Sequence, residues 1–382
     1  MTAAREIDFA TEPLPGEALH RALAQLRERG PVVEVRFAGR PAWLILGHAE
    51  LAAAFKDEAT FPAGEQYRRT IEPIQGRTFE SMDGEEHHRM RQLATPAFRS
   101  RAIERWQATG LRALAHELVD GLAGETAVDL VQRFTRRFTF LVITRMLGIP
   151  GEREDEFVGW AQGILSFDRG AAAAFTEYAL PIVVARRREP RGDVISALIR
   201  SEVEGRRLSD EEILSHVRLL FSAGATTTHD GLGSMLYALL THPDVLAAVR
   251  AEPDRIGDAI EELLRWETPV ANLPRVTLSG ATRGGVEIPP EGIALFGITA
   301  ANRDPEVFDD PDRFVLGRDT KRKLSFGLGS HSCPGLHLAR KEIRVATEVL
   351  LERLPGLALA DEAAARPRGT TIRGPEALPV TL

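Results

Sequence analysis

A cysteine stands in a glycine-rich segment directly before a predicted helix. Three glycines and a histidine lie close to it in the run Phe326, Gly327, Leu328, Gly329, Ser330, His331, Ser332, Cys333, Pro334 and Gly335. Glycines let the backbone turn tightly, so several N–H groups can point at one sulfur atom. With the nearby helix N-terminus, these N–H groups favour a thiolate over a thiol. A thiolate that accepts backbone hydrogen bonds and is shielded from solvent is suited to ligate haem iron.

Cys333 is the only cysteine among the 382 residues. A lone cysteine excludes an intramolecular disulfide and a cysteine-rich zinc or iron–sulfur site built within one chain. A secreted disulfide scaffold is therefore excluded as a class. Free cysteine is most often a small, buried apolar side chain, so an inert Cys333 is the competing interpretation.

The region from Phe326 to Arg340 has the spacing F-G-x-G-x-H-x-C-x-G-x-x-L-A-R. This pattern resembles the haem-ligand signature of cytochromes P450 of the soluble bacterial type, and the similarity extends from about residue 20 to the C-terminus. The resemblance implies a mainly α cytochrome P450 fold, with a large helical part and a smaller β-rich part. It also implies haem b (iron protoporphyrin IX) as cofactor, with Cys333 as the iron ligand in a loop shaped by Phe326, Gly327 and Gly335.

His87 and Arg91 are spaced i and i+4, so one face of a helix can present both to a single carboxylate. Taken alone, this spacing would also suit a solvated polar face. The P450 resemblance implies that His87, Arg91, Arg275 and His331 bind the two haem propionates.

Glu262 and Arg265 are spaced i and i+3 on a predicted helix and can form an ion pair. Such a pair is common on protein surfaces. Its place ahead of the cysteine loop resembles the buried Glu–Arg pair that P450s use to hold the loop-rich segment beneath the haem. We expect Arg318, rather than Arg313, to be the third member. The stretch 301–305 and Phe308 also resemble the family pattern.

An apolar helical run from Leu219 to Asp230 resembles the long P450 helix that crosses the haem and activates oxygen. The family pattern is A-G-x-acid-T. Ala223, against the haem, and Gly224, at a kink that admits oxygen, match it, and Thr227 is the expected alcohol. Thr226 replaces the usual acid, which weakens the standard proton path. A buried helix rich in β-branched residues is the alternative without that role.

Asp230 is i+4 from Thr226 and i+3 from Thr227, on the same helical face. We hypothesise that Thr227 still hydrogen-bonds bound oxygen while Asp230 or His229 supplies protons through water. The missing acid leaves altered oxygen chemistry open, either peroxide-driven, coupling or desaturating. A haem-thiolate binding or sensor protein without turnover is a further alternative. No arginine lies between Phe221 and Gly233, which argues against a fatty-acid peroxygenase.

The sequence has no flavin, iron–sulfur or dinucleotide fingerprint, so electrons must come from separate proteins. We expect an acidic ferredoxin or flavodoxin with its NAD(P)H-dependent reductase. Basic residues near the cysteine loop could steer such a partner, although a merely solvated charged face is the alternative. They are Lys321, Arg322, Lys323, Arg340 and Lys341, joined by Arg99, Arg101 and Arg105.

The predicted reaction is insertion of one oxygen atom from O₂ into a small or medium apolar substrate by a haem-thiolate monooxygenase. The short connection 168–170 leaves little room for a large lid, which suggests the limited substrate size. By position in the family pattern, the substrate pocket should be lined by Tyr67, Ile74, Phe79, Leu165, Phe167, Val270, Ala271, Asn272, Leu273, Thr371 and Ile372.

The elements that must position these residues follow from apolar periodicity and from glycine and proline breaks. We expect helices over 18–29 and from near Cys333 to Leu354, and strands over 32–37 and 42–46. Short strands should fill 275–300, a loop 302–329, and an edge strand 378–380. The prediction is one cytochrome P450 domain over 1–382, with a β-containing N-terminal portion at about 30–60, a helical core at about 85–270 and the haem-ligand loop at 326–335.

Composition narrows the class of protein further. Acidic residues outnumber basic ones by 55 to 48, giving a net charge of −7, which argues against a nucleic-acid partner. The N-terminal residues lack the apolar core of a signal peptide, and no run reaches the roughly 18 apolar residues of a membrane span. These features favour a cytoplasmic protein.

Overall fold

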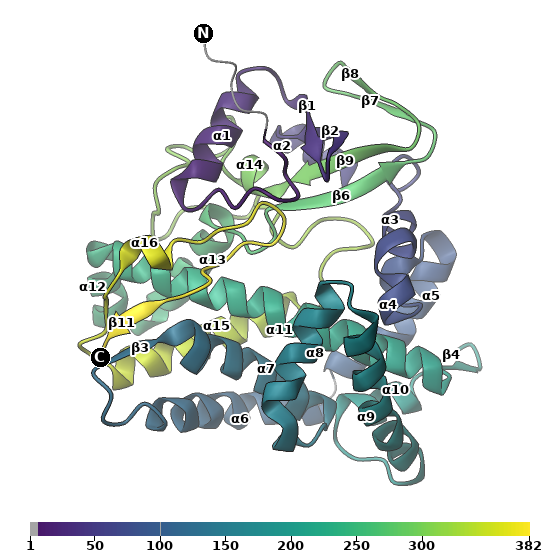
Figure 1. The fold of residues 1–382 in the computed structure, drawn as a ribbon, viewed down its shortest axis with the longest axis vertical. Helices are drawn as coiled ribbons and strands as arrows, with labels where there is room; N and C mark the ends of the chain where they lie inside the picture. Colours follow the sequence, from purple (N-terminus) through teal and green to yellow (C-terminus); the bar gives the residue numbers. More distant parts are fainter. Residues whose placement is uncertain (1–6, 100) are drawn as a thin grey trace.

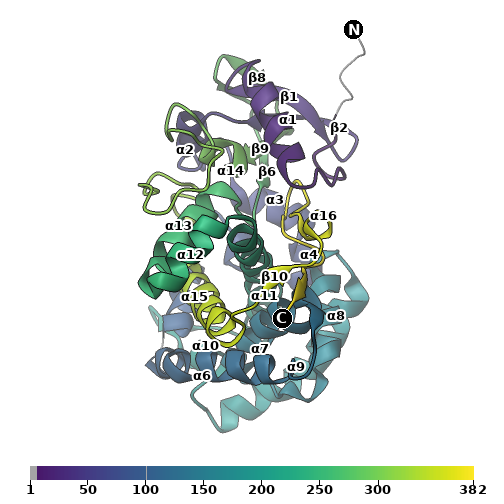
Figure 2. The same ribbon diagram turned by 90° about the vertical axis from the view of Figure 1, so that its left-hand side faces the viewer.

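The computed structural model describes residues 7–99 and 101–382. Helices make up most of it, and a smaller β-rich part lies at the end that carries the N-terminus (Figure 1). The helix α11 (Asp210–Thr241) crosses the middle of the helical part, and other elements surround it in the view along its axis (Figure 2). This architecture confirms the predicted mainly α fold with a minor β part.

The helical part is assembled around α11. Its other helices are α5 (Gly84–Ala94), α6 (Arg101–Asp120), α7 (Arg136–Leu147), α8 (Glu154–Leu165), α9 (Arg169–Arg188), α10 (Val194–Arg200), α12 (Pro243–Ala251), α13 (Ile256–Trp266) and α15 (Leu336–Arg353). The helices α7, α8, α9, α13 and α15 all pack against α11. A helix enclosed in this way is apolar around most of its circumference, which explains its long apolar run.

A capping box sets the start of α11. The Glu212 N–H donates to Ser209 Oγ (3.2 Å), and the Ser209 N–H donates to the Glu212 carboxylate (2.9 Å). These two bonds satisfy N–H groups that a helix start otherwise leaves unpaired.

The shorter helices lie mainly in and beside the β-rich part. They are α1 (Glu17–Arg27), α2 (His48–Ala54), α3 (Ala63–Thr70), α4 (Glu72–Gln75), α14 (Ile298–Asn302) and α16 (Glu362–Ala365). Helices α1 and α15 begin and end within three residues of the predicted bounds 18–29 and 333–354, respectively.

A four-stranded sheet forms most of the β-rich part, in the order β1 (Val32–Phe37), β2 (Arg40–Ile45), β9 (Gly292–Gly297) and β6 (Asn272–Thr277). The pairs β1–β2 and β6–β9 are antiparallel, whereas β2–β9 is parallel. Strand β6 carries Arg275, which lies opposite Ala294 of β9. Two hairpins form separate two-stranded sheets. One pairs β4 (Glu202–Val203) with β5 (Arg206–Arg207), and the other pairs β7 (Ala281–Arg283) with β8 (Val286–Ile288).

The C-terminal strand differs from its prediction. We expected an edge strand at 378–380, but β11 (Pro379–Thr381) is the middle strand of a three-stranded sheet, between β10 (Ala358–Leu359) and β3 (Ala127–Asp129). Pro379 suggested an edge because it lacks an N–H donor. Its carbonyl still accepts a hydrogen bond from the Ala360 N–H (2.9 Å), so a short central strand tolerates the proline.

The apolar core is divided in the same way as the fold. One large cluster unites the helices, and two smaller clusters lie on the four-stranded sheet and its helices. Within the described residues, no single helix has both the length and the apolar composition required to cross a membrane.

Candidate haem-thiolate site

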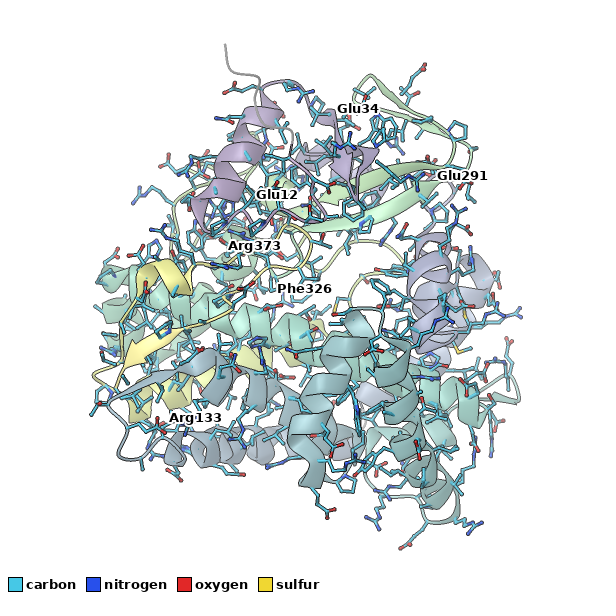
Figure 3. The ribbon with its side chains drawn as sticks, viewed as in Figure 1. Glu12, Glu34, Arg133, Glu291, Phe326 and Arg373 are labelled. Carbon is cyan, nitrogen blue, oxygen red and sulfur yellow. The ribbon has the colours of Figure 1, made fainter. Side chains whose placement is uncertain are left out.

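The backbone of the cysteine loop requires glycine at two positions. Gly327 and Gly329 have φ of +67° and +77°, a region that residues with a side chain rarely adopt. A Cβ on Gly329 would also lie 2.9 Å from the Phe55 carbonyl oxygen. The loop is closed by the Cys333 N–H, which donates to the Phe326 carbonyl (2.9 Å). Figure 3 labels Phe326, where this loop begins, near the middle of the view.

Cys333 lies three residues before the first residue of α15, and Gly335 is the N-cap. Burial raises the pKa of the Cys333 thiol and the Glu80 carboxylate raises it further, whereas the Gly335 N–H, which donates to the sulfur, lowers it. Arg91 and Arg340 also lower this pKa. The side chain is nevertheless half-buried rather than fully covered. A sulfur held inside the protein with surface left open suits a thiolate that a metal ion completes.

Four predicted propionate-binding residues come together beside this loop. The rings of His87 and His331 stack with their centroids 3.8 Å apart. Arg91 donates to the carbonyl of Ser332, next to the cysteine. Arg275 lies over the Tyr67 ring, 5.4 Å from its centroid. The structure thus gathers groups from α5, β6 and the cysteine loop at one place.

The two histidines of this cluster have lowered pKa values, and ring nitrogens of both lack hydrogen-bond partners. Burial and the charge of Arg91 lower the pKa of His87 to about 4. Burial, His87 and Arg275 lower the pKa of His331 to about 3. The Nε2 atoms of both rings are buried and have no hydrogen-bond partner within the described residues. Buried polar atoms usually have partners, so the cluster fits a ligand that brings carboxylates, as the two propionates of a haem would.

A cavity of about 370 Å³ opens between α11 and the cysteine loop. Its lining is mostly apolar and includes Ile143, Met146 and Leu147 of α7, Leu220 and Gly224 of α11, and Pro334, Gly335 and Leu338 at the start of α15. An apolar space beside the cysteine, with cationic groups nearby, fits a large apolar cofactor that carries acidic substituents.

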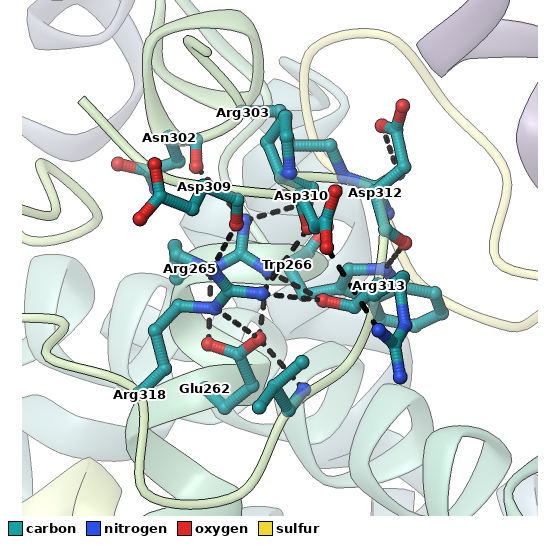
Figure 4. Close-up of polar contacts among 12 residues, drawn as sticks. Glu262, Arg265, Trp266, Asn302, Arg303, Asp309, Asp310, Asp312, Arg313 and Arg318 are labelled. Carbon is teal, nitrogen blue, oxygen red and sulfur yellow. Dashed lines mark hydrogen bonds and ion pairs between the residues drawn. The ribbon is translucent and has the colours of Figure 1, made fainter. Parts of the chain in front are cut away.

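The predicted ion-pair network is assembled as expected (Figure 4). The fully buried Glu262 carboxylate accepts from Arg265 Nη2 (2.7 Å) and Nε (2.9 Å), from Arg318 Nε (3.0 Å) and from the Val315 N–H (3.0 Å). Arg265 also donates to the carbonyls of Asn302, Pro311 and Arg313. Arg313 contributes only its carbonyl oxygen here, because its exposed side chain lies beside Asp310. The network ties α13 to the loop that leads towards Cys333.

The 301–308 stretch anchors the same loop from the other side. Asn302 Oδ1 accepts from the Leu324 N–H (2.7 Å), and its Nδ2 donates to Ser325 Oγ (2.9 Å). Arg303 donates to the carbonyl of Trp266 (2.9 Å). Asp304 accepts from the His48 N–H (2.8 Å) at the start of α2. Asn302 and Ser325 therefore position the residues that immediately precede the cysteine loop, a role that the sequence motifs did not reveal.

The segment of α11 that was predicted to activate oxygen is held by local contacts. The Thr227 hydroxyl donates to the Ala223 carbonyl (2.9 Å), and a Cβ on Gly224 would meet Ile143 Cδ1 at 3.0 Å. Asp230 faces the backbone of Gly374, since a Cβ on that glycine would lie 2.4 Å from Asp230 Oδ1. Burial raises the pKa of Asp230 to about 7.

His229 bonds away from Asp230. Its Nδ1 lies 2.9 Å from Thr135 Oγ1 of the segment before α7, and its Nε2 lies 3.9 Å from the Asp230 carboxylate. The hypothesis of a proton supply to Thr227 through Asp230 or His229 stays a prediction.

The predicted pocket residues separate into two groups. Tyr67, Ile74 and Phe79 lie near the cluster of His87 and Arg91: the Tyr67 ring stacks on Arg275, and Phe79 lies 6.0 Å from the guanidinium of Arg91. Half-buried Leu165 ends α8, and exposed Phe167 follows at a φ of +64°.

The prediction that Ala271 lines the pocket is wrong. Its side chain is fully buried in the N-terminal cluster around Phe9 and Leu19, because the chain alternates its faces as it enters β6. The next residue, Asn272, donates to the Thr370 carbonyl, and the Thr371 hydroxyl donates to the Phe9 carbonyl (3.4 Å). These polar groups therefore tie the N-terminal segment to the C-terminal loop. Val270 and Ile372 form a bridge, with Ile372 exposed and Leu273 packed on the sheet cluster.

The basic surface near the cysteine loop is smaller than expected. Lys323 and Arg340 both pair with the Glu261 carboxylate at 2.5 Å, so two of the expected cations share one acid and their net charge falls from +2 to +1. Lys321 and Arg322 are exposed. The side chains of Arg99, Arg101 and Arg105 lie outside the described part of the chain.

Comparison with known proteins defines the family. The model of the family described as Cytochrome P450 matches residues 10–171 and 170–356. The chain is 36% identical to 6-deoxyerythronolide B hydroxylase of Saccharopolyspora erythraea, over 95% of this chain and 96% of that one. It is 35% identical to mycinamicin IV hydroxylase/epoxidase of Micromonospora griseorubida, over 100% of both.

Solved structures agree with these sequence matches. The structure of CYP109Q5 from Chondromyces apiculatus superposes with a TM-score of 0.88 at 32% identity, over 95% of both chains. The fold and the cysteine loop therefore define an enzyme of the haem-dependent oxidoreductase class. The chain belongs to the cytochrome P450 family, and this membership implies a haem cofactor.

Proposed function

We propose that this P450 is a haem b monooxygenase that hydroxylates a medium-sized apolar compound with electrons from separate redox proteins. The observation that carries the proposal is the glycine-built loop holding Cys333 beside two histidines whose buried Nε2 atoms have no hydrogen-bond partner in the described chain. The overall reaction would be RH + O₂ + 2e⁻ + 2H⁺ → ROH + H₂O. Haem b, when bound, supplies the iron at which dioxygen is reduced and one oxygen atom is transferred to substrate.

The residues of this chain would divide the work between holding the cofactor and arranging protons. The Cys333 sulfur would ligate the iron, and the Gly335 N–H that donates to it moderates the negative charge on the sulfur. His87, Arg91, Arg275 and His331 would hold the two propionates. The Thr227 hydroxyl, held by the Ala223 carbonyl, would keep a proton at the α11 side of the cavity.

The proposed substrate class rests on the lining of the site and on the relatives. The cavity wall is mainly apolar, and the connection between α8 and α9 is only residues 166–168. Relatives are named hydroxylases of 6-deoxyerythronolide B and of vitamin D(3). An apolar compound of medium size meets both features, and the apolar wall would keep water away from it.

Separate redox partners follow from the absence of any flavin or iron–sulfur fingerprint in the sequence. The exposed Lys321 and Arg322 offer a small basic surface near the cysteine loop, which suits an acidic ferredoxin or flavodoxin served by an NAD(P)H-dependent reductase.

The test combines two measurements on the haem-loaded protein. A compound screen for the absorbance change that accompanies loss of water from the iron identifies ligands. Turnover of these ligands with NAD(P)H, a surrogate ferredoxin and its reductase should give products that are heavier by one oxygen atom. Ligands that bind but are never oxidised, although the protein is reduced normally, would count against a monooxygenase.

Peroxide-driven chemistry is a second candidate, because Thr226 occupies the position where the family pattern has an acid. The same ligands incubated with hydrogen peroxide and no reductase distinguish the two candidates. Faster product formation with peroxide than with the ferredoxin system would favour this second function.

A further inference from the structure

A second pocket lies between α1, α14 and the loop that follows α14. It has a volume of about 430 Å³ and shares no lining residue with the cavity beside Cys333. Helices α1 and α14 contact each other in this region, in the β-rich part of the molecule (Figure 1, Figure 2). The pocket lining includes His20 and Arg27 of α1, Thr299 of α14, and Arg303 of the following loop.

Each of these four residues carries a buried polar atom without a partner. The atoms are His20 Nδ1, Arg27 Nε, Thr299 Oγ1 and Arg303 Nη2, and none has a hydrogen-bond partner among the described residues. His20, Thr299 and Arg303 are more than nine-tenths buried as whole residues. Buried polar atoms usually have partners, so four such atoms around one pocket indicate a ligand that supplies them together.

The two arginines offer only hydrogen-bond donors. Arg27 donates through Nη2 to the Ala300 carbonyl (2.5 Å). Arg303 donates through Nε to the Trp266 carbonyl (2.9 Å) and through Nη1 to the Asp312 carboxylate (3.1 Å). The groups left over, Arg27 Nε and Arg303 Nη2, cannot accept a hydrogen bond, because a guanidinium keeps its protons. The ligand therefore brings acceptors, and an anion binds most strongly because both donors are charged.

His20 offers an acceptor instead. Its Nε2 lies 3.0 Å from the Glu267 carboxylate, which also pairs with Arg373. Because a carboxylate accepts, Nε2 carries the ring hydrogen. Burial lowers the pKa of His20 and the charge of Arg303 lowers it further, whereas Glu267 raises it, so the ring is neutral overall and Nδ1 is a bare acceptor. The ligand therefore needs a proton to donate as well as charged oxygens.

This set of atoms distinguishes among anions. A carboxylate or a sulfate accepts from both arginines but has no proton to donate to His20 near neutral pH. A hydrogen phosphate group does both, because it keeps an O–H beside its charged oxygens. The acids at the pocket, Glu28 and Asp312, are exposed, so water and salt screen their repulsion of an anion.

We propose that this pocket binds a phosphate group that carries a proton, held by Arg27, Arg303 and Thr299, with His20 accepting from its O–H. A free phosphate ion and a phosphate monoester share this chemistry and differ in how much of the pocket they fill. Because the pocket and the cavity beside Cys333 have no residue in common, the proposed oxygen chemistry can fail without affecting phosphate binding.

The test measures binding to the haem-loaded protein by calorimetry at pH 6, where free phosphate and its monoesters both keep a proton on a large share of the molecules. The probes are inorganic phosphate, glycerol 3-phosphate and sulfate at equal ionic strength. Phosphate should bind about 10-fold more tightly than sulfate, despite its smaller charge, and should raise the unfolding temperature. Tighter binding of glycerol 3-phosphate than of phosphate would identify an ester as the ligand, and equal or weaker binding the free ion.

Three variants locate the binding site. Arg27→Gln keeps a donor for the Ala300 carbonyl but removes the charge, and should weaken phosphate binding about 10-fold. Thr299→Val preserves the shape of the side chain and should weaken it about threefold. Arg29→Gln, an exposed residue just after α1, should leave binding within about twofold. The proposal is overturned if phosphate does not bind saturably, if sulfate binds as tightly as phosphate, or if Arg27→Gln and Thr299→Val both bind phosphate like the wild-type protein.

Discussion

The cysteine side and the α11 side of the candidate site are built on different electrostatic principles. Beneath the cysteine loop, the fully buried Glu262 receives hydrogen bonds from Arg265, Arg318 and the Val315 N–H. On the α11 side, no hydrogen bond reaches the Asp230 carboxylate within the described chain, and its Oδ1 lies 3.9 Å from His229 Nε2. Burial raises the pKa of Asp230 to about 7.

The difference follows from what each side must do. The cysteine side holds one sulfur atom in one position, whatever the substrate, so the protein itself can supply every partner of the Glu262 carboxylate beneath the loop. The α11 side must admit oxygen, protons and a substrate, and groups that are satisfied in advance would have nothing left to bind. We infer that Asp230, whose carboxylate accepts no hydrogen bond in the described chain, is free to act in function, whereas the fully bonded Glu262 is structural.

The largest expected effect comes from breaking the cysteine side at Glu262. Glu262→Ala leaves Arg265 and Arg318 buried without their carboxylate, which typically costs about 3–5 kcal/mol. We expect a loss of that size in the free energy of unfolding, measured by denaturant titration, together with loss of bound haem. The neighbouring Glu261→Ala is the matched control: its carboxylate is 34% exposed, so its pairs with Lys323 and Arg340 should contribute only about 1 kcal/mol. Full haem content and unchanged stability in Glu262→Ala would refute the structural role.

The next effect contrasts one glycine from each side. Gly329→Ala puts a side chain at a φ of +77° and at 2.9 Å from the Phe55 carbonyl, so it should destabilise the protein by about 2–3 kcal/mol. Gly224→Ala gains helix propensity of about 1 kcal/mol but meets Ile143 Cδ1 at 3.0 Å, so its net effect should lie near zero. Thermal unfolding of both variants measures the contrast, and equal losses would show that the α11 side is built as rigidly as the loop.

More of the cysteine side than of the α11 side could be predicted from the sequence, and the reason is physical. The loop geometry depends on Gly327, Gly329 and Cys333, which are close together in the chain, so local spacing carries the information. Glu262 and Arg265 are related by helical spacing alone. The third member, Arg318, lies 56 residues from Glu262, and only the family resemblance made it predictable.

The α11 side depends on contacts that spacing does not encode. Helical periodicity places Asp230 on the face of Thr227, yet it cannot show that Gly374 packs against the Asp230 carboxylate. Ala271 was misplaced because it directly precedes β6, where the sequence does not show which side of the chain faces the N-terminal core cluster.

A smaller effect tests the electrostatics of Asp230. Its pKa is raised from 3.8 to about 7, so the folded protein holds a proton there that the unfolded chain releases between these values, and stability falls as the pH rises through that window. Asp230→Asn removes this penalty. One pKa unit corresponds to about 1.4 kcal/mol, and the side chain keeps some solvent contact, so we expect a gain of about 1–2 kcal/mol at pH 8 and none at pH 4. Asp244→Asn, exposed on α12, is the control, and a gain that does not change with pH would contradict the unpaired-acid interpretation.

The smallest expected effect concerns the docking surface beside the cysteine loop. Because Lys323 and Arg340 both pair with Glu261, steering of an acidic partner falls mainly to the exposed Lys321 and Arg322, and two exposed charges change encounter rates only modestly. The double variant Lys321→Glu with Arg322→Glu should lower the rate of reduction by an acidic ferredoxin about threefold at low ionic strength, with the gap closing as salt screens the charges. Arg29→Glu, an exposed charge after α1, should not change the rate. An unaltered salt dependence in the double variant would move the docking surface elsewhere and leave the cysteine side with a purely structural set of charges.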